Sequence, residues 1–188
     1  MPIRAFVAIP IGEPWDDYLA ALTRDLSRLV GGVSWVKPGN FHMTLRFLGD
    51  LGESGVARLG DAMARGAEGA TAPVAELGGI GAFPSLERPR VLWVGLARGG
   101  DELLALGRRV NAAIDAAGFE RADKPFRPHL TLGRVREGAR GLEALRGYAP
   151  PPAPPAAPLD RIVVMKSDLH PSGSRYTALR EVRLPPQR

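Results

Sequence analysis

The chain has 188 residues, 45% of them hydrophobic and 24% charged, which is an ordinary balance for a folded globular protein. No stretch reaches the roughly 18 consecutive apolar residues of a membrane span, and the segment after Met1 lacks a signal-peptide pattern. A cytoplasmic protein without a membrane partner is therefore expected. The absence of cysteine excludes disulfides, thiolate metal sites and a cysteine nucleophile. The net charge of +5 favours polyanionic partners, although a high arginine content explains it equally well.

In chain order, strand-like and helix-like segments alternate. A first strand is expected at residues 4–10, followed by a helix at residues 14–30, where apolar residues recur at helical spacing until Gly31 and Gly32 end it. Asp101 is expected to cap the third helix. The other expected strands are 35–36, 41–48, 74–80, 91–96, 127–135, 161–167 and 176–184, and the other expected helices are 54–67, 101–117 and the short 142–148.

The segment 149–158 (APPPAPPAAP) contains too much proline for a helix or a central strand. It is expected to form a stiff surface connector within the domain. Alternatively, this segment, and residues 150–158 in particular, could bind a proline-recognising domain of another protein.

A His-x-Thr pattern occurs once in each half of the chain, beginning at His42 and at His129. Each copy lies on an expected strand. This repeat predicts an α+β fold with two similar lobes, in which two antiparallel sheets face a central cleft and helices lie outside. Residues 1–188 are expected to form a single bilobal domain, and a monomer is expected because nothing in the sequence suggests a dimer interface.

Strand alternation assigns the residues of the first copy to two faces. One face holds His42, Thr44 and Arg46, and the other, expected to face the core, holds Phe41, Met43, Leu45 and Phe47. The polar face therefore combines a titratable group, a hydroxyl and a cation.

In the second copy, His129 and Thr131 share the polar face while Leu130 and Leu132 face the core. Arg134 has the wrong parity for the polar face. It reaches that face only if the strand bulges or ends near Gly133.

Two histidines suit the opening of a cyclic phosphodiester, which needs a base to activate water and an acid to protonate the departing oxygen. The hydroxyls of Thr44 and Thr131 can donate hydrogen bonds to phosphate, and Arg46 and Arg134 can offset its negative charge. No metal and no cofactor are expected, because the pattern lacks the carboxylates of a metal site.

At this point the sequence resembles a known family. The segments RAFVAIP, VSWVKPGNFHMTLRFLGDL, FPSLERPRVLWVGL, FRPHLTLGRV and VVMKSDLHPSGSRYTAL resemble the bacterial and archaeal RNA 2′,3′-cyclic phosphodiesterases, once called 2′–5′ RNA ligases (LigT type), of the two-histidine (2H) phosphoesterase superfamily.

The resemblance implies a bilobal fold and metal-independent hydrolysis of RNA 2′,3′-cyclic phosphate ends to 2′-phosphates. It further implies that His42 is the general acid, that His129 is the general base, and that Thr44 and Thr131 hold the phosphate. Tyr176 matches a position that the family often keeps near the cleft, although a core tyrosine is an equal interpretation.

Other residues receive weaker assignments. Phe47 has core parity, with base stacking as the alternative, and His170 is expected in an exposed turn outside both motifs. Lys37, Arg127 and Arg136 are candidates for a basic surface that follows an RNA backbone, or are simply solvated.

Several functions stay open on the sequence alone. Joining of tRNA halves through a 2′–5′ linkage, hydrolysis of another cyclic or 2′–5′ phosphodiester, and binding of RNA ends without catalysis are the main alternatives. An adaptor role of the proline segment is another. Binding of nucleotides such as GTP or ATP is compatible with a phosphate site.

Overall fold

The computed structural model describes residues 2–170 and 173–187. Its helices are α1 (Trp15–Leu29), α2 (Glu53–Ala67), α3 (Gly100–Ala116) and the 3-10 helix η1 (Leu142–Arg146). Its strands are β1 (Ile3–Pro10), β2 (Gly31–Trp35), β3 (His42–Leu51), β4 (Val74–Phe83), β5 (Val91–Arg98), β6 (Leu130–Arg140), β7 (Ala157–Pro158), β8 (Arg161–Asp168) and β9 (Arg175–Arg183).

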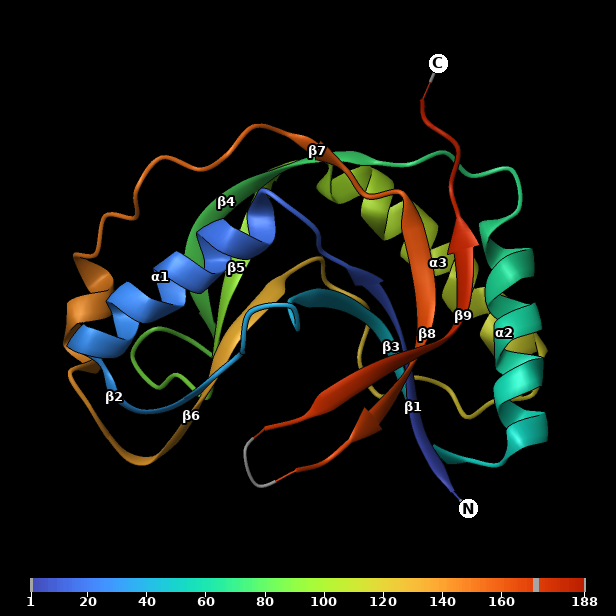
Figure 1. The fold of residues 1–188 in the computed structure, drawn as a ribbon, viewed down its shortest axis with the longest axis horizontal. Coiled ribbons are helices and arrows are strands. Elements are labelled where there is room, and N and C mark those ends of the chain that lie inside the picture. The colour runs from blue at the N-terminus through green and yellow to red at the C-terminus, as the bar shows by residue number, and fades with distance from the viewer. Residues whose placement is uncertain (1, 171–172, 188) are drawn as a thin grey trace.

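The strands form two antiparallel sheets that lie beside one another (Figure 1). The first has the order β3-β1-β8-β9 and the second has the order β2-β6-β5-β4-β7. Neither sheet is built from one half of the chain alone. The first sheet combines two N-terminal strands with the two C-terminal strands, and β2 from the N-terminal half joins the second sheet.

The helices cover the outer faces of the two sheets (Figure 1). Helix α1 packs against β2 and β6 of the second sheet, whereas α2 and α3 pack against the first sheet and against each other. This arrangement confirms the predicted α+β class with helices outside. The inner faces of the two sheets are not covered by these helices.

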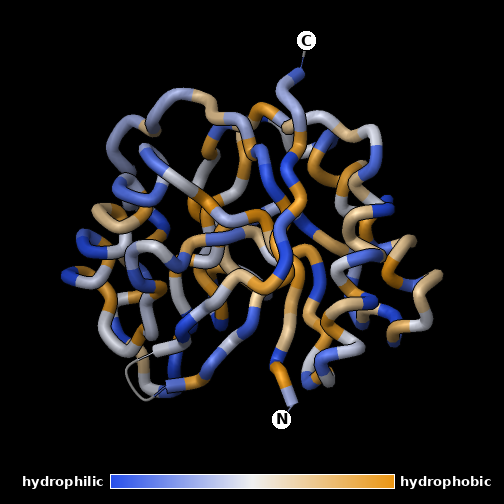
Figure 2. Tube along the Cα trace, turned by 45° about the vertical axis from the view of Figure 1, so that its right-hand side comes forward, coloured by the Kyte–Doolittle hydropathy of each residue, from blue (hydrophilic) through white to orange (hydrophobic). Residues whose placement is uncertain are grey.

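Each helix buries one stripe of apolar side chains, as helical spacing requires. Figure 2 shows the resulting alternation of hydrophobic and hydrophilic colour along the helices. Buried stripe residues are Trp15, Leu19, Leu22 and Leu26 in α1, Leu59 and Met63 in α2, and Leu103, Leu106, Val110 and Ile114 in α3. At Gly66 of α2, an added Cβ would lie 2.6 Å from Val110 Cα, so glycine permits the close approach of α2 and α3.

Most expected elements occur, with shifted ends. The expected cap at Asp101 is wrong: Asp101 lies in the first turn of α3, and Gly99 is the N-cap, with φ of 82° and no side-chain cap. Gly31 and Gly32 end α1 as expected but then begin β2. Within the described residues, no helix is long and apolar enough to cross a membrane.

The proline segment runs along α1, as a connector should. Trp15 Nε1 donates a hydrogen bond to the Pro155 carbonyl (3.1 Å), and the Tyr18 hydroxyl donates one to the Pro151 carbonyl (2.9 Å). Its end forms β7, which pairs with β4. The segment is thus held on the protein surface by side chains of the same chain.

Candidate active site

The first histidine strand, β3, has a β-bulge directly after its threonine. Thr44 and Arg46 pair with consecutive residues of β1, so Leu45 is an extra residue. A bulge shifts the alternation of the side chains beyond it by one residue. The face that carries His42 and Thr44 therefore continues with Phe47 instead of Arg46.

The second strand, β6, has its bulge at the equivalent position. Thr131 and Gly133 pair with consecutive residues of β5, so Leu132 is the extra residue. Arg134 consequently shares a face with Thr131. The bulge that the sequence required for Arg134 to reach this face is present, one residue before Gly133.

The two strands thus present corresponding sets of side chains, each spaced from its histidine in the same way. His42, Thr44 and Phe47 share one face of the first sheet, and Thr131 and Arg134 share one face of the second, with His129 directly before the first residue of β6. Both threonines are half-buried, whereas Phe47 is 60% exposed and Arg134 is exposed. The position five residues after the histidine is aromatic in one copy and cationic in the other.

Two predictions about β3 are therefore wrong. Arg46, expected beside the phosphate, is only 3% exposed and points toward α3. Phe47, expected to have core parity, is one of the most exposed large hydrophobic residues described. Both predictions assumed that side chains alternate between the two faces along the whole strand. The bulge at Leu45 breaks this alternation, but it leaves no trace in the sequence because Leu45 is itself apolar.

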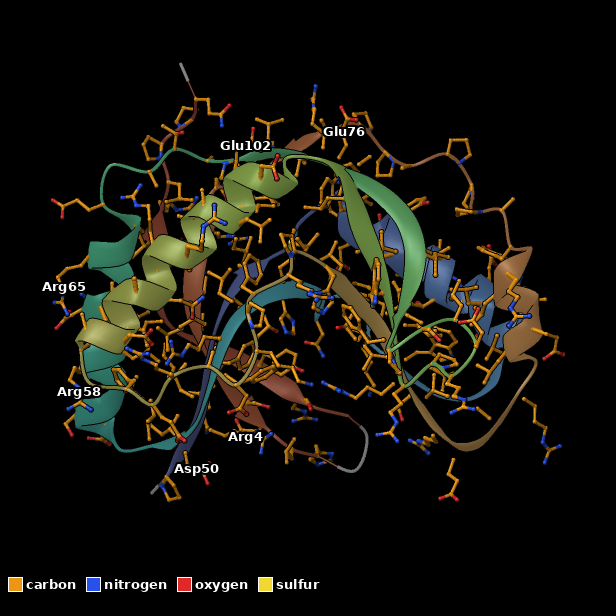
Figure 3. All side chains as sticks on the ribbon, turned by 180° about the vertical axis from the view of Figure 1, so that it is seen from behind. Arg4, Asp50, Arg58, Arg65, Glu76 and Glu102 are labelled. Atoms are coloured by element: carbon orange, nitrogen blue, oxygen red, sulfur yellow. The ribbon has the colours of Figure 1, made fainter. Side chains whose placement is uncertain are left out.

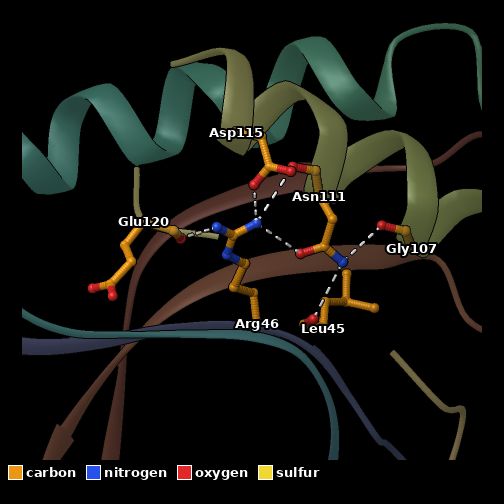
Figure 4. Close-up of polar contacts among 6 residues, drawn as sticks. All are labelled: Leu45, Arg46, Gly107, Asn111, Asp115 and Glu120. Atoms are coloured by element: carbon orange, nitrogen blue, oxygen red, sulfur yellow. Dashed lines mark hydrogen bonds and ion pairs between the residues drawn. The ribbon is translucent and has the colours of Figure 1, made fainter. Parts of the chain in front are cut away.

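The buried Arg46 joins β3 to α3 and to the segment after it (Figure 4). Its guanidinium donates to the Asp115 carboxylate, to Asn111 Oδ1 (3.4 Å) and to the Glu120 carbonyl. Asn111 Nδ2 also donates to the carbonyl of the bulge residue Leu45 (3.3 Å). These contacts compensate a buried charge and satisfy the backbone at the bulge.

Both histidines are oriented by a backbone carbonyl two residues earlier. His42 Nδ1 lies 2.7 Å from the Asn40 carbonyl oxygen, and His129 Nδ1 lies 2.6 Å from the Arg127 carbonyl oxygen. A carbonyl only accepts hydrogen bonds, so Nδ1 must carry the proton in each neutral ring. Nε2 is then the unprotonated nitrogen, ready to accept or deliver a second proton.

Burial lowers the pKa of both His42 and His129 below the ordinary imidazole value, while the two carbonyl contacts oppose this effect. The positive charge of Arg134 lowers the pKa of both rings further, and that of His129 lowers the pKa of His42. Groups from different sheets therefore act on one another electrostatically. The strands β3 and β6 are also in contact, so the two histidine motifs lie near one another.

Aromatic side chains surround His42. The Phe6 ring centroid lies 5.1 Å from that of His42, and the Tyr176 ring meets His42 edge-on at 5.1 Å. Phe47 contacts the other side of this group, 5.6 Å from Phe6. Tyr176 lies against the first histidine, and the role near the cleft that the family resemblance implies for it stays a prediction.

His129 has its own aromatic wall. The Phe83 ring meets it edge-on at 5.1 Å, and the Trp93 ring centroid lies 6.3 Å away. Trp93 lies flat across β4, where a Cβ at Gly81 would fall 2.3 Å from its ring. Gly81 therefore allows the position of Trp93 beside the second histidine.

Asn40 is a site residue that the sequence analysis missed. Its carbonyl orients His42, and its side-chain amide donates to the Ser174 carbonyl (3.1 Å), close to the start of β9. That contact holds the segment carrying Tyr176 near the first histidine. A backbone carbonyl has no sequence signature, so only the place of Asn40 two residues before the motif pointed to it.

The remaining candidates lie as follows. His170 is exposed and lies outside both motifs, and its carbonyl accepts a hydrogen bond from the Gly173 N–H (2.9 Å). Lys37 and Arg127 are both exposed. Among residues 2–170 and 173–187, no three His, Cys, Asp or Glu side chains gather as metal ligands would.

The family model described as "LigT like Phosphoesterase" matches the chain twice, at residues 9–93 and at residues 94–176. The chain belongs to the LigT-like phosphoesterase family. Each match contains one histidine strand, so the duplication seen in the two bulged strands extends over nearly the whole chain.

Relatives and solved structures of the LigT-like family agree with this assignment. The chain is 36% identical to an RNA 2′,3′-cyclic phosphodiesterase of Archaeoglobus fulgidus over 78% of this chain and 81% of that one. It is 30% identical to one of Thermotoga maritima, over 95% and 94%. The crystal structure of TT0787 of Thermus thermophilus superposes with a TM-score of 0.77 at 25% identity, covering 99% and 100% of the two chains. Escherichia coli LigT complexed with 3′-AMP has the same fold, with a TM-score of 0.74 at 22% identity and coverage of 98% and 99%.

Proposed function

We propose that this protein hydrolyses RNA 2′,3′-cyclic phosphate ends to 2′-phosphomonoesters without a metal. The observation that carries the proposal is the matched orientation of His42 and His129, each with Nδ1 on a carbonyl and Nε2 free for proton transfer. The names of the curated relatives support the substrate class.

In the proposed step, His129 Nε2 takes a proton from water as the water oxygen attacks phosphorus. The P–O3′ bond breaks, and the protonated His42 delivers its Nε2 proton to O3′. The products are a 2′-phosphomonoester and a free 3′-hydroxyl, with His129 protonated and His42 neutral. A histidine on each of two sheets suits the in-line path, since attack and departure occur on opposite sides of phosphorus.

The phosphate itself would be held by Thr44, Thr131 and Arg134. Each threonine follows its histidine by two residues, and its hydroxyl can donate a hydrogen bond to a non-bridging oxygen. Arg134 supplies the positive charge that Arg46 does not. A bound anion would also raise the pKa of both histidines toward the ordinary range, because it offsets the burial and the charge of Arg134.

The terminal base would stack on the exposed Phe47, with Tyr176 beside it. Phe47 is supported from behind by the buried Phe6, at 5.6 Å between centroids. An exposed aromatic ring on a rigid support is the usual platform for a nucleic-acid base.

The test is hydrolysis of an oligoribonucleotide that ends in a 2′,3′-cyclic phosphate, in EDTA, by the wild type and by His42→Ala and His129→Ala. Wild-type conversion to a 2′-phosphate, with kcat about 10²–10⁴ lower in each variant, is the expected result. Near-normal turnover in either variant would contradict the two-histidine mechanism. Formation of a 2′–5′ linkage, or turnover of only a different cyclic diester, would favour the corresponding alternative. Binding without any turnover would favour an RNA-end-binding module.

A further inference from the structure

The inner face of β6 continues as a row of hydrogen-bond donors beyond the proposed phosphate site. After Thr131 and Arg134, Arg136 follows on the same face, because residues two apart on a strand point to the same side. Arg136 is exposed, and its Nε donates to Ser34 Oγ at 2.7 Å. Ser34 lies on the neighbouring β2, directly paired with Arg134.

Arg134 and Arg136 differ from some other exposed arginines of this protein in their ion pairing. Several exposed arginines elsewhere form ion pairs, such as Arg98 with Glu76 and Arg180 with Asp61. Within the part of the chain that the structure describes, neither Arg134 nor Arg136 forms one. Their positive charge is therefore available to a bound anion, and that of Arg134 already reaches both histidines.

The equivalent stretch of β3, residues 47–51, carries no cationic side chain. Counted from its histidine, the position of Arg136 corresponds to Gly49 on β3, and the acidic Asp50 follows it. A polyanion extending from the site is thus attracted along β6 and not along β3. We therefore expect a bound RNA strand to extend from the site along β6.

We propose that Arg136, held by Ser34, forms a subsite for the phosphodiester on the 5′ side of the terminal nucleotide. This inference rests on the proposed function for the identity of the substrate. A 2′,3′-cyclic phosphate occupies the 3′ end of a strand, so the chain can continue only in the 5′ direction. Arg136 lies about 7 Å beyond Arg134 along the strand, at about 3.3–3.4 Å per residue.

The contact with Ser34 prepares Arg136 for this role. Because Nε is engaged by the serine, both Nη groups of the guanidinium remain for the oxygens of one phosphate. Fixing the long side chain in advance also reduces the entropy that binding would cost. The enzyme should therefore prefer oligonucleotide ends to nucleoside 2′,3′-cyclic monophosphates, which lack this phosphodiester.

The kinetic test compares two substrates, a nucleoside 2′,3′-cyclic monophosphate and a dinucleotide ending in the same cyclic phosphate. For Arg136→Gln, the ratio of kcat/KM for the dinucleotide to that for the mononucleotide should fall about three- to tenfold. Ser34→Ala should lower the ratio in the same direction by less. The matched control is Arg65→Gln on the outer helix α2 (Figure 3), which removes the same charge and should leave the ratio within about twofold of wild type.

The dependence on salt gives a second readout. The slope of log(kcat/KM) for the dinucleotide against log salt concentration should become shallower by about 0.7 in Arg136→Gln, the value for one contact to a single-strand phosphate. Equal losses on both substrates would overturn the subsite, because Arg136 would then act on the cyclic phosphate itself. An unchanged ratio would overturn it as well.

A binding measurement separates this inference from the proposed function. The 2′-phosphomonoester products of both substrates are titrated against the wild type and Arg136→Gln, with intrinsic tryptophan fluorescence as the signal, to which Trp93 near His129 contributes. A dinucleotide that binds more tightly than the mononucleotide, by a margin lost in Arg136→Gln, supports the subsite even if no turnover occurs. Absence of turnover alone would count against the proposed function, and equal affinity of the two products would count against the subsite.

Discussion

Arg46 and Asp115 form an ion pair between β3 and α3, in which the arginine side chain is 1% exposed and the aspartate side chain is 36% exposed. Removal of Arg46 would leave Asp115 partly solvated but would also strip Asn111 and the Glu120 carbonyl of a donor. We expect Arg46→Met to lower the free energy of unfolding by about 1–3 kcal/mol, measured by urea denaturation.

Arg134→Met is the matched comparison for Arg46→Met. Arg134 is exposed and unpaired by carboxylates among the residues described, so its loss should change the unfolding free energy by less than about 0.5 kcal/mol while lowering kcat/KM. If instead Arg46→Met abolished phosphate binding without loss of stability, Arg46 would be a phosphate ligand and not a structural residue.

The pH dependence of kcat/KM should reflect the lowered pKa values of His42 and His129. Activity needs a neutral base and a protonated acid, so the rate peaks between or near the two apparent pKa values of the pair. Burial, the charge of Arg134 and, for His42, the charge of His129 all act downward. The maximum for the free enzyme should therefore lie on the acidic side of the ordinary imidazole pKa.

Arg134→Gln tests the sign of the electrostatic effect on both rings. The variant removes a positive charge that disfavours protonation, so both pKa values should rise and the whole kcat/KM profile should move to higher pH. The Arg65→Gln variant provides a control for the change in net charge. A profile that stays in place, or moves to lower pH, would show that Arg134 does not act on the histidines.

Phe47 and Phe6 should separate binding from stability. Phe47→Ala should raise KM about tenfold through lost base stacking, with little change in the free energy of unfolding, because the ring is 60% exposed. Phe6→Ala should cost about 3–5 kcal/mol of stability, because that ring is 1% exposed. Steady-state kinetics and urea denaturation of both variants measure the two effects. An unchanged KM in Phe47→Ala would show that Phe47 does not stack on the base.

A glycine pair on β4 tests the support of His129. Gly81→Ala should displace Trp93, since the new Cβ would lie 2.3 Å from its ring, and should cost about 1–3 kcal/mol together with a fall in kcat. Gly79→Ala is the control, because a Cβ at Gly79 meets nothing within 4 Å. Near-UV circular dichroism reports the tryptophan environment. Normal kcat in Gly81→Ala would show that the aromatic wall does not position His129.

The sequence located the two histidine motifs but did not predict the side-chain directions beyond their threonines. Each threonine follows its histidine by two residues and lies before the bulge, so the alternation of faces still applies between them. Beyond the bulge the alternation misassigned Arg46 and Phe47. Alignment of the two copies held the missing signal: Arg134 follows His129 by five residues, as Phe47 follows His42, so a bulge required in one copy implies the same bulge in the other.

The fold class was predictable for a similar reason, but the sheet composition was not. Periodicity identifies a strand and its approximate ends, and it located most elements of this chain. It contains no information about which strand pairs with which over long connections. The pairing of β1 with β8 and of β2 with β6 depends on packing between residues more than 90 positions apart.

Because strands are exchanged between the sheets, the two repeats of the sequence do not correspond to the two sheets of the structure. The two segments that the family model matches, residues 9–93 and 94–176, are halves of the sequence but not of the structure, because each sheet contains strands from both. Neither repeat expressed alone could complete its sheet or cover its histidine. Each histidine strand thus lies in a sheet that contains strands of both repeats, so we expect the two repeats to fold only together.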